Sequence, residues 1–308
     1  MLTQTQLDAF HRDGFLVVRG LFDAAEIEEL RAAAAQVQAD AVAGKGEGHS
    51  FREVDGERRY FRTDGLWDLH PAFRRATVKP ELLAAVGQCV GHPFLPINDS
   101  IVVKLPGSGV PIEWHQDPPY YDPATAFAET FAVPNFDVDV YLDVADLETG
   151  CLFGIPGHHL VGRTHVERFA EEDLFAHPDA VALEMAPGDV LFHALSAPHG
   201  SRANEGRTIR RVFYLHYMAR EVLEHCYADW TARPNRGFGE DGIAWARGLV
   251  AEADGAAALA AAGVELTEAG FVFAGEPRTP PRHWGSLIAA LGPEEIADRR
   301  DLKATAAA

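Results

Sequence analysis

The sequence is poor in cysteine, and its three cysteines are widely spaced: Cys89, Cys151 and Cys226. They form no CxxC pair, which excludes the common cysteine-based zinc and redox motifs. An odd and sparse set also argues against a disulfide-stabilised secreted scaffold. We therefore expect a reducing, cytoplasmic environment in which the cysteines serve as small core residues.

Long apolar runs and positive charge are scarce as well. No run of about eighteen apolar residues occurs, so we expect no membrane-spanning helix. The first residues lack a basic stretch followed by an apolar one, so we also expect no signal peptide. Lysine and arginine number 27 against 46 aspartate and glutamate, and the formal net charge is −19. Such a field repels nucleic acid and anionic membranes, which leaves a small molecule as the expected partner. The sequence indicates no oligomeric state.

Helix signals concentrate near the beginning of the chain. Thr3 with Gln6, and Asp23 with Glu26, form capping-box patterns that predict two helix starts, and Gly14 can end the first helix. Residues 82–90 are also helical in pattern, and the Ala-rich stretch 249–262 predicts a surface helix or a helix pair. Residues 43–68 are predicted to form a loop or short hairpin.

Strand signals dominate the middle of the chain. The expected strands cover residues 15–18, 96–105, 112–117, 136–144, 151–155, 190–192 and 210–218. Their Gly/Pro turns predict a mostly β protein with flanking helices, built as a double-stranded β-helix or jelly-roll (cupin-like) barrel. We expect a single domain, 1–308, with N-terminal helices and a lid loop in 1–95, the jelly-roll core in 96–220 and a helical segment in 221–308.

The most informative motif is Trp114-His115-Gln116-Asp117, followed far downstream by His199. The period-two geometry of a strand puts His115 and Asp117 on one side, while Gln116 points away and is expected to brace a loop. Two imidazoles and one carboxylate can hold one face of a metal ion and leave three positions open. A His-x-Asp motif alone is equally compatible with a hydrogen-bonded surface pair.

Arg210, downstream of His199, offers a guanidinium fork for a dicarboxylate. Arg207 and Arg211 are alternatives for this role. Because neighbouring strand residues face opposite sides, only one of Arg210 and Arg211 can point into the barrel. We favour Arg210 and expect Arg211 to be a solvated surface charge.

Around these residues the chain resembles the phytanoyl-CoA dioxygenase family of Fe(II)/2-oxoglutarate-dependent oxygenases, from Leu2 to Met218. Several motifs in the same order carry the resemblance: Leu7–Phe22, Lys104–Gly109, Trp114–Asp117, Gly150–Leu152, Ile155–His159, Pro187–Val190, His199–Ser201, Asn204 and Arg210–Arg211. A set of motifs in the same order is far more specific than any single one of them.

The resemblance implies that His115, Asp117 and His199 ligate Fe(II), and that Arg210 binds the far carboxylate of 2-oxoglutarate with Ser201 beside it. O₂ is the second cosubstrate. The resemblance further implies oxidation of a C–H bond with release of succinate and CO₂. Because the carboxylate of Asp117 is present, where halogenating relatives have a small residue, we expect hydroxylation.

Three polar residues share one parity on the strand that precedes the metal motif: Asn98, Ser100 and Lys104. They are expected to face the barrel, and we assign Asn98 and Lys104 to the cosubstrate. Lys104 is also compatible with a solvent position at the end of the strand.

The substrate side is expected to involve Trp114, Tyr120, Arg62 and His193. Residues 118–136 and 51–62 are rich in aromatic residues and long enough to cover the barrel mouth. Aromatic rings favour a partly apolar small molecule, and arginines can hold an acidic group on it. We therefore expect hydroxylation of an unactivated C–H bond of a small specialised metabolite. A tryptophan in such a context is more often a core residue than part of a pocket wall.

Two other classes of function use the same residues. A metal-dependent isomerase or hydrolase with Zn²⁺ or Mn²⁺ on these ligands would need neither Arg210 nor O₂. A non-catalytic relative would keep the fold to bind a ligand. Release of succinate under air with added Fe(II) separates both from a dioxygenase.

Overall fold

A computed structural model describes residues 1–91, 93–107, 110–117, 134–161, 164, 166, 170–220, 222–223, 242–253, 255–274, 291 and 294–295. The helices of these ranges are α1 (Gln4–Asp13), α2 (Ala24–Val42), α3 (Leu66–Leu69), α4 (Pro71–Thr77), α5 (Pro80–Val90), the short 3₁₀ helix η1 (His158–Leu160), α7 (Glu171–Phe175), α9 (Gly242–Glu252) and α10 (Ala256–Ala261). The strands are β1 (Phe15–Val18), β2 (His49–Val54), β3 (Glu57–Asp64), β4 (Phe94–Lys104), β5 (Ile112–His115), β6 (Phe136–Tyr141), β7 (Leu152–Gly154), β8 (Val181–Leu183), β9 (Val190–Ala194), β10 (His199–Ser201), β11 (Arg210–Ala219), β12 (Val264–Thr267) and β13 (Gly270–Phe273).

The two predicted capping boxes are confirmed. The Thr3 side chain accepts from the Gln6 backbone, and the Gln6 side chain accepts from the Thr3 backbone in return. Asp23 and Glu26 make the same reciprocal pair at the start of α2. Gly14 ends α1 in a left-handed conformation, with φ of 81°. Both boxes satisfy amide groups that would otherwise lack partners at a helix start.

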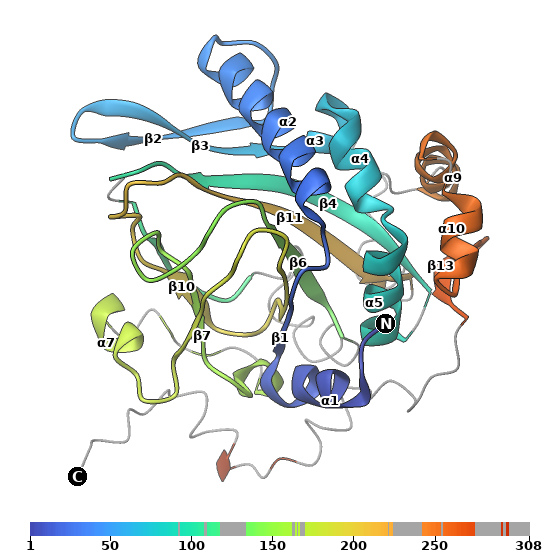
Figure 1. The fold of residues 1–308 in the computed structure, drawn as a ribbon. Coiled ribbons are helices and arrows are strands. Elements are labelled where there is room, and N and C mark those ends of the chain that lie inside the picture. The colour runs from blue at the N-terminus through green and yellow to red at the C-terminus, as the bar shows by residue number, and fades with distance from the viewer. Residues whose placement is uncertain are drawn as a thin grey trace.

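Two sheets form the body of the protein. The larger has the order β1-β9-β6-β11-β4-β13-β12, with β3 also paired to β4 and β2 to β3. The smaller has the order β5-β10-β7-β8. Figure 1 shows α2, α4 and α5 on the outer side of the large sheet, while β7 and β10 lie on its other side. The arrangement of two facing antiparallel sheets is the one expected for a jelly roll.

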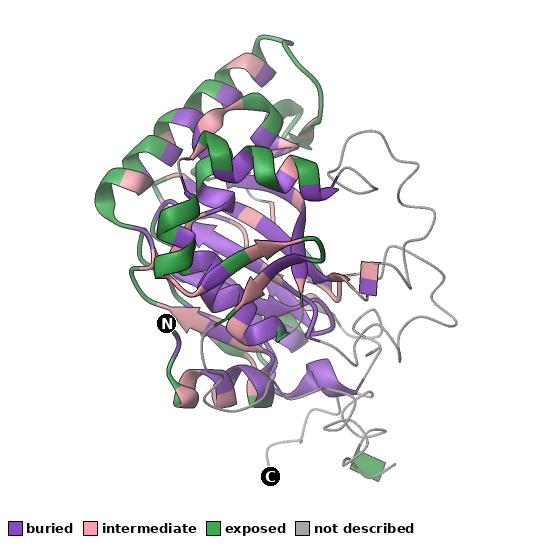
Figure 2. Cartoon of the chain, turned by 90° about the vertical axis from the view of Figure 1, so that its right-hand side faces the viewer, coloured by how far each residue is buried: buried purple, intermediate pink, exposed green. Residues whose placement is uncertain are grey.

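Strand alternation divides the interior into two apolar layers. Phe213 and Leu215 of β11 belong to the core between the large sheet and its helices. Val212 of the same strand belongs to a second apolar cluster, together with Leu152 of the small sheet. In Figure 2, buried residues fill the strands and one side of each large helix, while exposed residues lie on the other side. The even-numbered residues of β11 therefore face the space between the sheets as far as His216, where the register shifts.

Two hairpins add strands to the large sheet. Residues 49–64, expected as a loop or short hairpin, form the β2–β3 hairpin, and Arg62 of β3 pairs with Val102 of β4. The segment after residue 220, expected as helical, contains α9 and α10 but also the β12–β13 hairpin, which joins β4 through Phe271. The helical prediction missed this hairpin, because a partner strand supplied by the large sheet outweighed local preference.

The described cysteines Cys89 and Cys151 are buried and unpaired. Among the described residues, no helix combines the length and the apolar character that crossing a bilayer requires.

The turn before β9 ties the beginning of the chain to the large sheet. Gly188 has φ of +89°, and its carbonyl accepts from the Phe22 amide at 3.1 Å. A Cβ on Gly188 would lie 2.3 Å from the Phe22 oxygen, so any side chain there would collide with backbone. Asp189 accepts from the Gly20 amide at 2.9 Å and forms an ion pair with Arg19 at 2.6 Å.

We expect Gly188→Ala to lower the free energy of unfolding by more than about 2 kcal/mol, because a left-handed conformation and a backbone collision both oppose the methyl group. Chemical denaturation measures this loss. Gly56→Ala is the matched control, since Gly56 has φ of +77° with no atom within 4 Å of the added Cβ. Equal losses in the two variants would contradict the role of the turn.

Candidate metal and cosubstrate site

The pairing of β5 with β10 brings together two histidines that are far apart in sequence. His199 lies directly opposite His115 in the antiparallel register. Their ring centroids are 4.3 Å apart. Asp117 lies just past the end of β5, where its amide donates to the Leu195 carbonyl at 3.0 Å. The three predicted metal ligands are therefore neighbours in the structure.

Backbone contacts fix the tautomers of both histidines. Nδ1 of His115 lies 2.7 Å from the Glu113 carbonyl oxygen, and Nδ1 of His199 lies 2.9 Å from the Ala197 carbonyl oxygen. A carbonyl only accepts, so each Nδ1 carries a proton and donates it. Each neutral ring then presents the lone pair of Nε2, the arrangement found in metal-ligating histidines.

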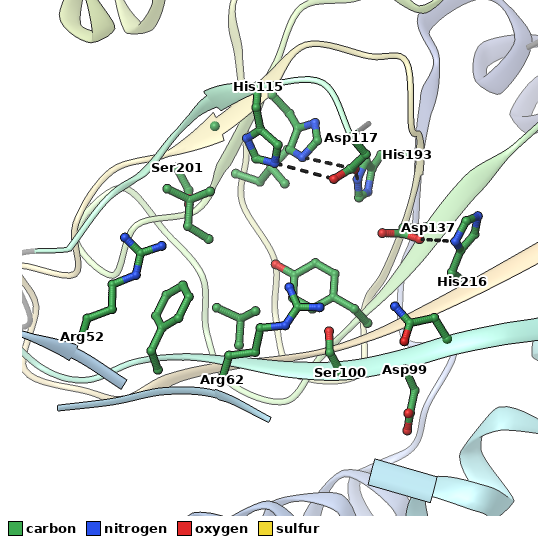
Figure 3. A pocket seen from close by; sticks show the side chains of 18 residues that line it. Arg52, Arg62, Asp99, Ser100, His115, Asp117, Asp137, His193, Ser201 and His216 are labelled. Atoms are coloured by element: carbon green, nitrogen blue, oxygen red, sulfur yellow. Dashed lines mark ion pairs between the residues drawn. The ribbon is translucent and has the colours of Figure 1, made fainter. Parts of the chain in front are cut away.

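These lone pairs converge on a carboxylate. The distance from Asp117 Oδ1 to His115 Nε2 is 3.7 Å, and the distance from Asp117 Oδ2 to His199 Nε2 is also 3.7 Å. All three ligand atoms lie within 4.8 Å of one another. Three acceptors that share a space without a proton between them need a cation, and two imidazoles with one carboxylate suit Fe(II). Figure 3 shows His115 and Asp117 side by side at one end of a cavity.

The protonation states agree with this arrangement. Burial by itself would raise the pKa of Asp117, but the neighbouring His199, His193 and His115 outweigh it and lower the pKa. Burial, followed by the nearby His115, lowers the pKa of His199 to about 3. An ionised carboxylate and a neutral imidazole are the forms that bind a metal.

Arg210 and Lys104 form a buried pair of cations, and Lys104 connects the pair to Ser201, two residues past His199. They lie opposite each other in the register of β11 with β4, with exposures of 0% and 1%. The ammonium of Lys104 donates to Ser201 Oγ at 2.7 Å and to the Ser201 carbonyl at 3.1 Å. The three guanidinium nitrogens of Arg210 have no hydrogen-bond partner among the described residues. A buried guanidinium without acceptors fits a carboxylate that the protein itself does not supply.

The two alternative arginines lie elsewhere. Arg207 is exposed. Arg211 forms a two-pronged ion pair with Asp143, at 2.7 and 3.0 Å, and its side chain is only 12% exposed. The expectation that Arg211 is a solvated surface charge is therefore wrong. The face of β11 that carries Arg211 packs under α2, and Asp143 binds the Arg211 side chain there.

A cavity of about 200 Å³ adjoins the triad. The large sheet lines it with Asn98, Ser100, Asp137, His193, Tyr214 and His216. The small sheet contributes His115, Leu152, His199 and Ser201, and the β2–β3 hairpin contributes Arg52, Phe61 and Arg62. The predicted residues Asn98, Ser201, His193 and Arg62 thus share one space.

Trp114 does not line this cavity. It is 6% exposed and packs against α7, with its ring centroid 5.3 Å from that of Phe175. A core position therefore replaces the predicted substrate contact, because neighbouring residues of β5 face opposite sides. Gln116 braces a loop as expected, accepting from the Thr164 amide at 2.8 Å. Tyr120 lies outside the described residues.

His193 sits behind Asp117. Its Nε2 is 3.6 Å from Asp117 Oδ2, and its Nδ1 is 3.4 Å from Asp139 Oδ1. Burial opposes the charged form of the ring, but Asp139 and Asp117 outweigh burial and raise the pKa of His193 well above its ordinary value. An imidazolium between two carboxylates is suited to orient Asp117.

The sequence reading assigned no role to several residues of the cavity. Asp137 of β6 and His216 of β11 both line it, and Arg52 does so from the hairpin. One signal was present: two aspartates, Asp137 and Asp139, alternate within a strand whose other residues are buried and apolar. Aspartates are almost never buried without a partner, so such a pattern indicates a polar space inside the barrel.

Mononuclear non-haem iron dioxygenases combine this fold with such a donor set, and comparison with known proteins points to the same class. The model of the phytanoyl-CoA dioxygenase (PhyH) family matches residues 10–212, well over half of the chain. The chain belongs to this family of Fe(II)/2-oxoglutarate-dependent dioxygenases. The expectation of iron, 2-oxoglutarate and O₂ is thereby confirmed at the level of the family.

Three relatives have names that describe oxidation of small phosphorus compounds. Methylphosphonate hydroxylase of Gimesia maris is 28% identical over 74% of this chain and 86% of its own length. The 2-aminoethylphosphonate dioxygenase of an uncultured bacterium is 24% identical over 70% of this chain and 81% of its own. A probable α-ketoglutarate-dependent hypophosphite dioxygenase of Stutzerimonas stutzeri is 27% identical over 66% of this chain and 73% of its own length.

Solved structures support the fold class. EctD from S. alaskensis with bound Fe superposes with a TM-score of 0.58 and 25% identity, over 71% of this chain and 78% of that chain. HygX from Streptomyces hygroscopicus, with nickel and 2-oxoglutarate bound, superposes with a TM-score of 0.57 and 21% identity, over 71% of this chain and 87% of that chain. The carbocyclase SnoK from nogalamycin biosynthesis superposes with a TM-score of 0.56 and 21% identity, over 71% of this chain and 85% of that chain. The latter two likenesses concern the fold alone.

We expect His199→Ala to weaken Fe(II) binding by more than about 100-fold, beyond the loss typical of an outer-sphere partner. Anaerobic calorimetric titration of the protein with Fe(II) measures the affinity. His177→Ala is the control, because His177 and His199 are both 7% exposed and His177 lies outside the triad. Wild-type affinity in the His199 variant would remove the assignment of this triad to the metal.

Proposed function

We propose that this protein hydroxylates an unactivated C–H bond of a small specialised metabolite that carries an oxyanion group, converting 2-oxoglutarate to succinate and CO₂. The observation that carries the proposal is the convergence of His115, Asp117 and His199, together with a buried Arg210 whose guanidinium has no acceptor among the described residues. When bound, Fe(II) with 2-oxoglutarate and O₂ supplies the oxidising chemistry. His115, Asp117 and His199 would hold the iron.

The protein's own contribution is position and exclusion of water. Arg210 and Ser201 would hold the far carboxylate of 2-oxoglutarate, and Lys104 adds positive charge beside them while fixing the Ser201 hydroxyl. His193 keeps Asp117 oriented through Asp139. Because these groups are buried, their electrostatic interactions are stronger than they would be in water.

Arg62 and Arg52 are the candidates for binding the oxyanion of the substrate. Figure 3 shows both on the side of the cavity away from His115 and Asp117. The Arg62 guanidinium forms an ion pair with the Asp64 carboxylate at 2.6 Å. The Arg52 guanidinium carbon lies over the Phe61 ring, 4.2 Å from its centroid. Guanidinium groups that are already oriented suit an oxyanion, because less side-chain entropy is lost on binding. The names of the three relatives, which refer to phosphonates and hypophosphite, support this choice.

The intact carboxylate of Asp117 supports hydroxylation over halogenation. The buried guanidinium of Arg210 argues against an isomerase or hydrolase with Zn²⁺ or Mn²⁺, because such a reaction needs no dicarboxylate cosubstrate. The test is succinate formation by the protein with Fe(II), 2-oxoglutarate and air, with small phosphonates and related oxyanions as substrates. No succinate under any of these conditions would overturn the proposal.

We expect Arg210→Met to raise the KM for 2-oxoglutarate by about 10- to 100-fold, because the variant loses a charge-assisted hydrogen-bonded pair with the far carboxylate. Succinate formation against 2-oxoglutarate concentration measures it. Arg207→Met is the matched control, because Arg207 is exposed. A normal KM in the Arg210 variant would give the anchoring role to another cation.

We expect Arg62→Ala to raise the KM for an oxyanion substrate by about 10-fold or more, while succinate formation without substrate continues. The measurement compares succinate formed with substrate consumed. Arg59→Ala, on the same strand but outside the cavity lining, is the control. Unchanged coupling and KM in the Arg62 variant would contradict its contact with the substrate.

A further inference from the structure

The end of β6, the beginning of β11 and the end of β4 meet at the same end of the large sheet, where the three strands run side by side (Figure 1). Arg210 lies opposite Lys104 in the register, and Tyr141 lies opposite Val212, two residues further along β11. Diagonal positions on neighbouring strands are within reach of long side chains. The guanidinium carbon of Arg210 lies 5.6 Å from the centroid of the Tyr141 ring. The two side chains are therefore neighbours on the inner face.

The hydroxyl of Tyr141 is a buried donor without an acceptor. Tyr141 is 0% exposed, and its hydroxyl has no hydrogen-bond partner among the described residues. The guanidinium of Arg210 cannot accept the phenol proton, because a guanidinium carries donors only. Burial raises the pKa of Tyr141 well above its ordinary value, so the phenol keeps this proton. A buried hydroxyl in this condition destabilises the folded protein unless a ligand supplies the acceptor.

Other buried tyrosines of the chain have partners. Tyr217 is also 0% exposed, and its hydroxyl donates to the Thr77 carbonyl at 2.7 Å. The hydroxyl of Tyr60 lies 2.6 Å from Oγ1 of Thr63. Tyr141 departs from this pattern, and it does so beside a cation that also lacks an acceptor. Unsatisfied polar groups in a native structure are expected at sites built for a ligand.

The polar groups next to this pair are already engaged. The ammonium of Lys104 donates to the hydroxyl and the carbonyl of Ser201 and to the Arg202 carbonyl, so three acceptors use its three protons. Asp139 lies two residues before Tyr141 on the same face, and its Oδ1 is 3.4 Å from Nδ1 of His193. The protein therefore leaves the donors of Arg210 and Tyr141 together, without an acceptor among the described residues.

We propose that the hydroxyl of Tyr141 is a further donor to the far carboxylate of 2-oxoglutarate, beside the guanidinium of Arg210. This inference rests on the proposed function, in which Arg210 anchors that carboxylate. A carboxylate has two oxygens with about four lone-pair sites, enough for a two-pronged pair with Arg210 and one bond from the phenol. One anion thus satisfies both sets of donors. The cavity reaches this end of the sheet, because Val102 and Ser201 line it.

The experiment compares two probes that differ only at the far end: 2-oxoglutarate and 2-oxopentanoate, in which a methyl group replaces the far carboxylate. Each is titrated calorimetrically into protein loaded anaerobically with Fe(II), so the readout is binding and needs no turnover. We expect wild type to prefer 2-oxoglutarate by at least about 10-fold. Tyr141→Phe removes one oxygen and keeps the ring. We expect it to weaken 2-oxoglutarate binding by about 10-fold and to leave 2-oxopentanoate binding within about twofold.

Unchanged binding of 2-oxoglutarate by Tyr141→Phe, or equal losses for the two probes, would overturn the inference. Tyr217→Phe is the matched control, because it removes the same oxygen from a tyrosine that is equally buried. We expect Tyr217→Phe to keep the wild-type affinity for 2-oxoglutarate within about twofold, since the Tyr217 hydroxyl is bound to Thr77.

Stability without cosubstrate separates a ligand-binding role from a structural one. We expect Tyr217→Phe to lower the midpoint of chemical denaturation, because it leaves the Thr77 carbonyl without its donor. We expect Tyr141→Phe to keep the midpoint or raise it, because no partner is lost and an unsatisfied hydroxyl is removed. An equal drop in both variants would show that the Tyr141 hydroxyl serves the fold and would overturn the inference.

Arg210→Met, titrated with the same two probes, distinguishes the ways to fail. If this variant loses the preference for 2-oxoglutarate while Tyr141→Phe keeps it, the anchoring role of Arg210 stands and only the inference about Tyr141 falls. If Arg210→Met keeps the wild-type preference, the anchoring role falls and the inference falls with it. Loss of the preference in the Arg210 variant, with a partial loss in the Tyr141 variant, supports both.

Discussion

The antiparallel pairing of β5 with β10 is the constraint on which the site depends. It sets His199 opposite His115, and the backbone carbonyls of Glu113 and Ala197 turn both Nε2 lone pairs toward Asp117. Each carbonyl lies two residues before its histidine in the sequence, so the tautomers follow from the local backbone. A strand slip of one residue would send an imidazole to the opposite face of the small sheet, because side chains alternate. The geometry of the predicted metal ligands therefore depends on backbone hydrogen bonds.

The inner face of the large sheet carries an unusual density of buried charge. Acceptors gather around Asp117, and the cations Arg210 and Lys104 gather at the opposite end of the strands. Each group alone is costly to bury, since unpaired charges lose their hydration. The other face of the same sheet packs its apolar side chains under the helices. That layer stabilises the fold independently, so the inner face can be specialised for ligands of both signs.

Substrate choice, in our proposal, belongs to two elements that surround a fixed reaction centre. The β2–β3 hairpin contributes Arg52 and Arg62, and the inner face of the large sheet contributes Asp137 and His216. Neither element supplies a predicted ligand of the metal. Relatives that share the fold and the family can therefore differ in substrate by changing these walls while the triad stays the same. The wide range of names among the relatives and structural neighbours agrees with such a division.

The sequence by itself determined the local features: the capping boxes at Thr3 and Asp23, the strand alternation that sends Arg210 and Arg211 to opposite faces, and the spacing of His115 and Asp117. Each depends on residues a few positions apart, where backbone geometry alone sets the relation. Only the tertiary structure decided the rest, namely the addition of the two hairpins to the large sheet, the ion pair that buries Arg211, the core position of Trp114, and the place of Asp137 and His216 on one wall of the cavity. These depend on which distant strands pair and in which register, and that choice is made by the packing of the whole sheet, a sum of many contacts that no local pattern records.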